Sequence, residues 1–151
     1  MVAQVFHASL SDLDQAAQCT LGAIYELDNA RYKYVQFSGT TSIAVGTIVC
    51  YVAAGSDGKE VIVDGANTAL GAGVAINAVG TGTVLYGWIQ ITGITPISVT
   101  PAGSPAAGDN LTVNGAVAGN VTKATASNMQ VVAQYYGLVT AVANIIAEFP
   151  N

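Results

Sequence analysis

After residue 22, short largely apolar runs recur about every ten residues, some alternating with polar residues and others apolar at nearly every position. Short runs of this kind, rich in Val, Ile, Tyr and Thr and bounded by Gly, Pro, Asn or Asp, are typical of β-strands. The candidate strands are "AIYEL", "RYKYVQF", "TIVCYVA", "KEVIVD", "GVAINAV", "GTVLYGWIQITG", "TPISVT", "NLTVNG", "AVAGNVTKA", "QVVAQYYGLVTAV" and "NIIAEFP". No helical pattern of convincing length interrupts them. The sequence therefore predicts an all-β fold, a small barrel or sandwich of short antiparallel strands.

The first two runs predict a hairpin. "AIYEL" and "RYKYVQF" are separated by "DNA", a short turn rich in Asp and Asn. Such a turn between two alternating runs is a strong local signal for two paired antiparallel strands.

Residues 1–22 form a separate zone before the strands begin, and residues 23–151 are expected to form a single β domain. Ser11 is a candidate cap for a short helix over "DLDQAAQC", with Gly22 ending the segment. A helix this short is not stable alone, so we expect an arm that needs a surface to lie on. Without residues 2–15 the β domain should then remain folded, since its strand pattern starts only at Ala23.

Two candidate strands, 47–53 and 85–93, are largely apolar on both faces. In an α/β protein, helices cover such strands from both sides, but no helices are expected here. The remaining covers are neighbouring subunits or a large partner. Gly87, between Tyr86 and Trp88, is expected to mark a bulge or a close backbone approach. The residues expected at a subunit interface or in the core are Tyr51, Tyr86, Trp88, Ile89 and Ile91.

Charge is scarce and unevenly distributed. Charged residues make up 9% of the 151 residues, the net charge is −5, and no charged residue occurs from 65 to 108. The four basic residues do not cluster, which disfavours nucleic acid as a ligand. No apolar run is long enough for a membrane helix. An eight-stranded outer-membrane barrel has a similar size, but the chain starts without the basic residues of an export signal. Cys19 and Cys50 are expected to be free thiols, a disulfide between them being the less favoured alternative.

No catalytic or metal-binding set can be assembled from the sequence, so we expect neither an enzyme nor a cofactor. His7 is the only histidine, and no residues with metal-ligand spacing stand beside it. The Gly-rich stretch 71–87 lacks the spacing of a nucleotide-binding loop. Asp57, Glu60 and Asp64 are better explained as solvated acids around a turn. The seven tyrosines could form a sugar-binding platform, although aromatic residues at this spacing are more often in a core or an interface.

Several short segments resemble the head decoration (cement) proteins of tailed bacteriophages. The resemblance covers most of residues 20–140 and rests on small apolar words. They are "LG" before the hairpin, "YKYV" in its second strand, "VG" before an apolar strand, the stretch "GVAINAVGTGTVLYGWIQITG", and "AGD" at 107–109.

This resemblance implies a β-rich, non-catalytic virion protein. It would be made in the host cytoplasm and would bind the major capsid protein on the outer capsid surface, stabilising the shell. Family members commonly form homotrimers, so sister subunits would cover the second face of 85–93. From this resemblance, together with the charge pattern and the lack of a long apolar run, we expect no nucleic acid, membrane or small-molecule partner. The alternative is a small β-barrel adhesin or carbohydrate-binding module of a virion fibre.

For the arm, composition rather than the resemblance suggests how it would bind. Its apolar residues would pack into a groove of the capsid protein, and its two acids would meet basic residues of the shell. The residues in question are Val2, Val5, Phe6, Leu10 and Leu13, with Asp12 and Asp14.

Overall fold

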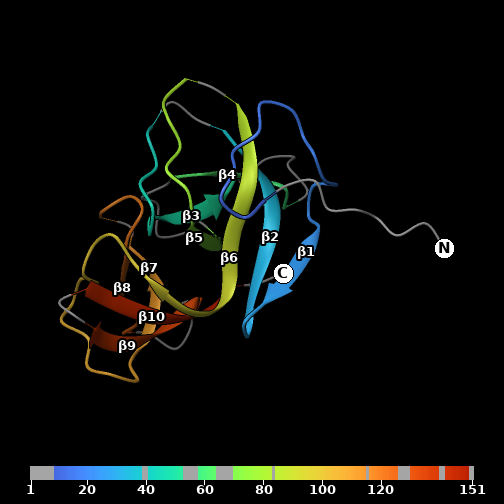
Figure 1. Cartoon of the computed structure of the whole chain (residues 1–151). Helices are drawn as coiled ribbons and strands as arrows, with labels where there is room; N and C mark the ends of the chain where they lie inside the picture. Colours follow the sequence, from blue (N-terminus) through green and yellow to red (C-terminus); the bar gives the residue numbers. More distant parts are fainter. Residues whose placement is uncertain are drawn as a thin grey trace.

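A computed structural model of the protein describes residues 9–38, 41–52, 58–63, 70–82, 84–114, 116–125, 130–139 and 142–149. These residues form β-strands and no helix, which confirms the all-β prediction (Figure 1). The strands are β1 (Ile24–Leu27), β2 (Ala30–Phe37), β3 (Ile48–Tyr51), β4 (Glu60–Ile62), β5 (Gly71–Ala75), β6 (Leu85–Pro96), β7 (Asn110–Val113), β8 (Val121–Lys123), β9 (Ala133–Val139) and β10 (Val142–Glu148).

The predicted hairpin is confirmed. β1 and β2 pair antiparallel, and the loop between them is the two-residue turn Asp28–Asn29. Both turn residues have positive φ, 50° and 63°. Asn and Asp tolerate this backbone better than other non-glycine residues, and a turn of this hand matches the twist of the paired strands.

Five strands close into a barrel in the order β2–β4–β3–β5–β6, with β6 returning to β2. The closing contact is the longest antiparallel ladder of the barrel, running from Arg31–Phe37 of β2 along Leu85–Thr92 of β6. The only parallel pair in this ring joins β2 to β4. Closure leaves the inner face of every strand of the ring turned toward one shared interior.

β6 belongs to the barrel and to a second sheet. Its first part pairs with β2 and β5, and its last part, Thr92–Pro96, pairs with β10. The strand changes partner at Gly93, whose φ is 97°. A methyl group at Gly93 would lie 3.1 Å from Ala30 Cβ, so glycine satisfies both the backbone angle and the close approach.

The second sheet has the order β6–β10–β9–β7–β8 and packs beside the barrel (Figure 1). Its inner face and the barrel share one core. A methyl group added to Gly71 of β5 would approach side-chain carbons of Val132, Phe149 and Val113 to between 2.9 and 3.1 Å. This close contact places the sheet directly against the outside of β5, so the described strands form one packed unit.

Two sequence-based expectations about element bounds are wrong. Residues 95–100 do not form a strand of their own, because β6 continues to Pro96, held along β10. The run 130–142 is not one strand, because β9 ends at Val139 and β10 begins at Val142. In both places the apolar pattern gives no sign of where one strand ends and the next begins, so periodicity alone does not set these bounds.

The short helix predicted after Ser11 is also absent. Ser11 Oγ donates to Asp12 Oδ1 at 3.3 Å, and Asp14 forms an antiparallel bridge with Tyr86 of β6. The segment is too short to gain much from helical hydrogen bonds, whereas the edge of β6 offers partners for extended backbone.

Candidate functional site

The two faces of β6 have different covers, both from the same chain. Ile89 and Ile91 belong to the main core, and Leu85 packs against it. On the opposite face, Trp88 is 1% exposed and its ring centroid lies 5.1 Å from that of Tyr34 and 6.0 Å from that of Tyr25. The expectation that sister subunits must cover this face is therefore wrong for Trp88, because a single chain already buries it.

Residues 9–22, which we call the strap, precede β1 and run along the paired strands β2 and β6, which we call the β2–β6 wall (Figure 1). Asp14 and Tyr86 exchange two backbone hydrogen bonds, each 2.8 Å long. The side-chain amide of Asn77 donates to Leu10 O at 2.9 Å. Through these contacts the strap supplies backbone pairing to β6 beyond the point where β5 ends at Ala75.

Gly87 makes room for the strap. A methyl group at this position would lie 2.8 Å from Leu13 Cδ2 and 3.4 Å from both Asp12 O and Phe37 Cε2. Leu13 in turn packs against the main core. Of the two roles expected for Gly87, the structure has the close approach, while the irregularity of the β2–β6 ladder lies elsewhere, between Arg31 and Tyr32.

The phenol of Tyr34 fastens the strap from the outer side of the wall. Its hydroxyl donates to Asp14 Oδ2 at 3.0 Å and accepts from the backbone N–H of Gln18 at 3.2 Å. Burial, followed by the interactions with Asp14, raises the pKa of Tyr34 to about 12 despite the opposing hydrogen bond from Gln18. The phenol thus stays protonated, as donation to a carboxylate requires.

The expected arm residues fall into three groups. Val2, Val5 and Phe6 lie outside the described residues. Leu13 and Asp14 are engaged with the barrel of their own chain, whereas Asp12 is exposed and Leu10 is half-buried. That the domain stays folded without residues 2–15 remains a prediction, but the deletion should now lower its stability, because Leu13 packs against the core and Asp14 accepts a hydrogen bond from Tyr34.

The other expected interface residues, Tyr51 and Tyr86, are half-buried on separate strands. Tyr51 Oη accepts a hydrogen bond from Lys33 Nζ at 2.9 Å, and the same Nζ lies 4.9 Å from the centre of the Tyr51 ring. Lys33 is only 8% exposed. The phenol and its ring therefore hold the buried ammonium group, which links β2 to β3.

A cluster of exposed apolar residues lies on the outer face of the second sheet and was missed from the sequence. Ile145 and Ala147 of β10 point into the core, so their neighbours along the strand face outward. Ile146 is the register partner of Ile94, which is 56% exposed. We call the exposed Ile94, Tyr136 and Val142, together with the half-buried Ile146, the outer apolar patch. Alternation within 142–148 could have indicated its β10 members, but not which face would remain uncovered.

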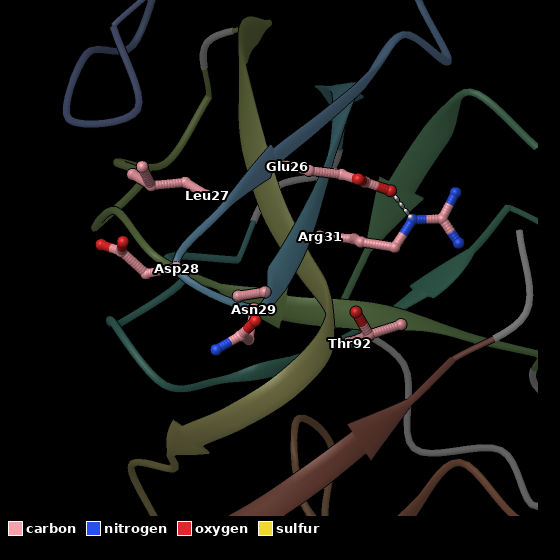
Figure 2. Close-up of a pocket in the computed structure, with 7 residues that line it drawn as sticks. Glu26, Leu27, Asp28, Asn29, Arg31 and Thr92 are labelled. Carbon is pink, nitrogen blue, oxygen red and sulfur yellow. Dashed lines mark ion pairs between the residues drawn. The ribbon is translucent and has the colours of Figure 1, made fainter.

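A shallow polar depression of about 400 Å³ lies at the β1–β2 turn and is lined by Glu26, Leu27, Asp28, Asn29, Ala30, Arg31 and Thr92 (Figure 2). Arg31 Nε pairs with Glu26 Oε1 at 3.0 Å, so the one cation in the depression already has an anionic partner. Leu27 and Asp28 point to the other side of the hairpin in the same view. The depression contains no nucleophile with an adjacent base.

The remaining candidates for chemistry are dispersed. Within the described ranges, no three His, Cys, Asp or Glu side chains are grouped to hold a metal ion. His7, Asp57 and Asp64 lie outside those ranges, and Glu60 begins β4. Cys50 is buried and Cys19 half-buried, and no disulfide joins them. No helix in the described part of the chain is long and apolar enough to cross a membrane.

Comparison with known proteins adds no relative. No family model matches the chain, and no curated protein matches its sequence.

Proposed function

We propose that this protein is a structural component of a tailed-bacteriophage virion, a decoration or cement protein. In this role it binds the major capsid protein on the outside of the head and stabilises the shell. Three features support the proposal: the short sequence segments that resemble such proteins, the small all-β fold, and the scarcity of charge in a chain with 9% charged residues.

The observation that carries the proposal is the outer apolar patch. Ile94, Tyr136 and Val142 are 56%, 48% and 45% exposed, and they lie on a sheet whose described inward side chains, such as Ile145 and Ala147, belong to the core. Exposed apolar residues gathered on one sheet face favour contact with another protein surface. Small molecules usually bind in concave sites, and the residues of the patch do not line the depression at the β1–β2 turn.

Sister subunits are the second partner in this proposal. A homotrimer on the capsid would let the patch face either a neighbouring copy or the shell. The buried position of Trp88 within one chain means that the trimer is not needed to cover β6. The proposal of a homotrimer is based instead on the outer apolar patch and on the resemblance to decoration proteins.

The alternative, a glycan-binding adhesin module, gains no support from the aromatic residues. Sugar platforms present aromatic rings to solvent, but Tyr34, Trp88 and Tyr135 are buried. Among the described residues, Tyr136 is the aromatic side chain that is prominently exposed.

Co-sedimentation with undecorated capsids of the encoding phage tests the proposal. Wild-type protein should pellet with the capsids and appear as added density on their surface in electron micrographs. The double variant Ile94→Ser/Tyr136→Ser should lose most of this binding while keeping its thermal stability. Val84→Ser, at a position 50% exposed and outside the patch, is the matched control and should bind like wild type.

Two outcomes would contradict the proposal in different ways. Absence of the wild-type protein from capsid pellets, combined with binding to an immobilised glycan, would favour the adhesin module. Full capsid occupancy by the folded double variant would show that the protein binds through a surface other than the patch.

A further inference from the structure

The strap is attached to a barrel that is complete without it. The β2–β6 ladder closes the ring through seven register pairs, none of which involves residues 9–22. Strap contacts lie outside this ring: the Asp14–Tyr86 bridge, the hydrogen bond from Asn77 to Leu10, and the bonds of Asp14 and Gln18 to Tyr34 Oη. Loss of these contacts therefore need not open the barrel.

The strap is attached at a few points, and Gly22 at its C-terminal end can act as a hinge. Residues 15–18 are exposed and connect the bridged part of the strap to its root. At the root, Gly22 has a φ of 86° and a methyl group added to it would meet nothing within 4 Å. The Gly22 N–H donates to Tyr34 O at 2.8 Å, which ties the root to β2. The part of the strap before the root is held by the hydrogen bonds above and by the packing of Leu13 against the core.

We propose that the strap opens as a unit about Gly22 while the barrel stays folded. Opening removes Leu13 from its place beside Gly87 and breaks the bridge to Tyr86. The backbone N–H and C=O of Tyr86 that bond to Asp14 then lose their partners. The apolar space beside Gly87 that Leu13 fills becomes empty. Proteins open locally in this way where few buried contacts hold a segment. The inference concerns the isolated chain and does not depend on the proposed function.

Native-state amide hydrogen exchange, followed by NMR in low urea, tests the opening. The amides of Asp14 and Tyr86, which bond to each other's carbonyls, should exchange about tenfold or more faster than those of the β2–β6 ladder. Their rates should also depend less on urea, because strap opening exposes less surface than global unfolding.

Two variants and a matched control test whether the hydrogen bond from Tyr34 to Asp14 holds the strap closed. Asp14→Asn and Tyr34→Phe each remove or weaken the bond between Tyr34 Oη and Asp14, and should speed exchange at Tyr86 about threefold to tenfold. Asp12→Asn, the same change at an exposed residue of the strap, should leave that rate as in wild type. Exchange of the Asp14 and Tyr86 amides at the rate and urea dependence of the β2–β6 ladder would overturn the proposal.

Discussion

At the scale of single residues, Gly87 shows how one missing side chain connects distant parts of the chain. It lies in β6, and the space beside it is occupied by Leu13 of the strap. Any larger residue would compete with Leu13 for that space, and the backbone of Asp12 stands directly behind it.

Gly87→Ala should therefore lower the free energy of unfolding by about 1–3 kcal/mol through overpacking. Gly80→Ala is the matched control, because a methyl group there would meet nothing within 4 Å. Urea denaturation of both variants measures the difference. Combining Gly87→Ala with Leu13→Ala should cost less than the sum of the two single changes, and strict additivity would argue against the contact.

Trp88 is the largest fully buried side chain of the described residues. Trp88→Ala should lower the free energy of unfolding by about 3–5 kcal/mol, as expected for truncating a buried aromatic residue. Tyr136→Ala, on an exposed ring, should change it by no more than about 0.5 kcal/mol. Thermal and chemical denaturation distinguish the two. A normally folded and equally stable Trp88→Ala protein would contradict the burial of this residue within one chain.

Tyr34 predicts a stability change at alkaline pH. Its pKa is raised in the folded protein to about 12 from an ordinary value of 10.0, chiefly by burial. The folded state therefore holds the phenolic proton more tightly than the unfolded state does. This contribution to stability is fully present below pH 10 and is lost as the pH rises toward about 12.

Tyr34→Phe should accordingly show a shallower loss of stability across that interval than wild type. The free energy of unfolding, measured in urea at several alkaline pH values, gives the comparison. Parallel pH profiles for the two proteins would mean that the phenol is not protected in the folded state.

At the scale of elements, the strap belongs to the packed unit even though it contains no strand. Removing residues 2–8 leaves all the strap contacts described above, whereas removing residues 2–15 takes away Leu13 and Asp14 together. The longer deletion should lower the free energy of unfolding by about 2–4 kcal/mol, from a lost apolar contact and a lost charge-assisted hydrogen bond. The shorter deletion keeps both residues and should not show this loss.

Capsid binding by the same two truncations separates stability from recognition. If residues 1–8 contain the contact to the shell, the shorter deletion should abolish co-sedimentation with undecorated capsids without changing the melting temperature. Unchanged occupancy of capsids by both truncated proteins would place the contact on the β domain and exclude the N-terminal residues from it.

At the scale of the whole molecule, the outer apolar patch and the low charge density favour self-association. Sedimentation velocity of the purified protein at micromolar concentration should show a homotrimer. Ile94→Glu should shift the protein toward monomer, because a carboxylate in an apolar contact is costly to bury. A wild-type protein that sediments as a clean monomer would rule out the trimer in solution and leave assembly on the capsid as the only setting for it.

The sequence by itself determined the local features of this protein. Short runs rich in β-branched and aromatic residues, bounded by turn residues, predicted strands at most of their observed positions, and "DNA" predicted the β1–β2 hairpin. These features depend on neighbouring residues, so they can be read from the sequence. Gly87 was recognised as a special position from its place between two large aromatic residues.

Only the tertiary structure decided the features that depend on contacts between distant segments. These are the sharing of β6 between two sheets, the docking of the strap at Gly87 and Tyr34, and the burial of Trp88 without a second subunit. When a strand is apolar on both faces, both faces are expected to be buried. The sequence of the strand does not show which other segment buries each face. The sequence predicted that the strap would bind another protein. In the structure it pairs with β6 of its own chain, because backbone groups of β6 beyond the end of β5 are free to form hydrogen bonds with it.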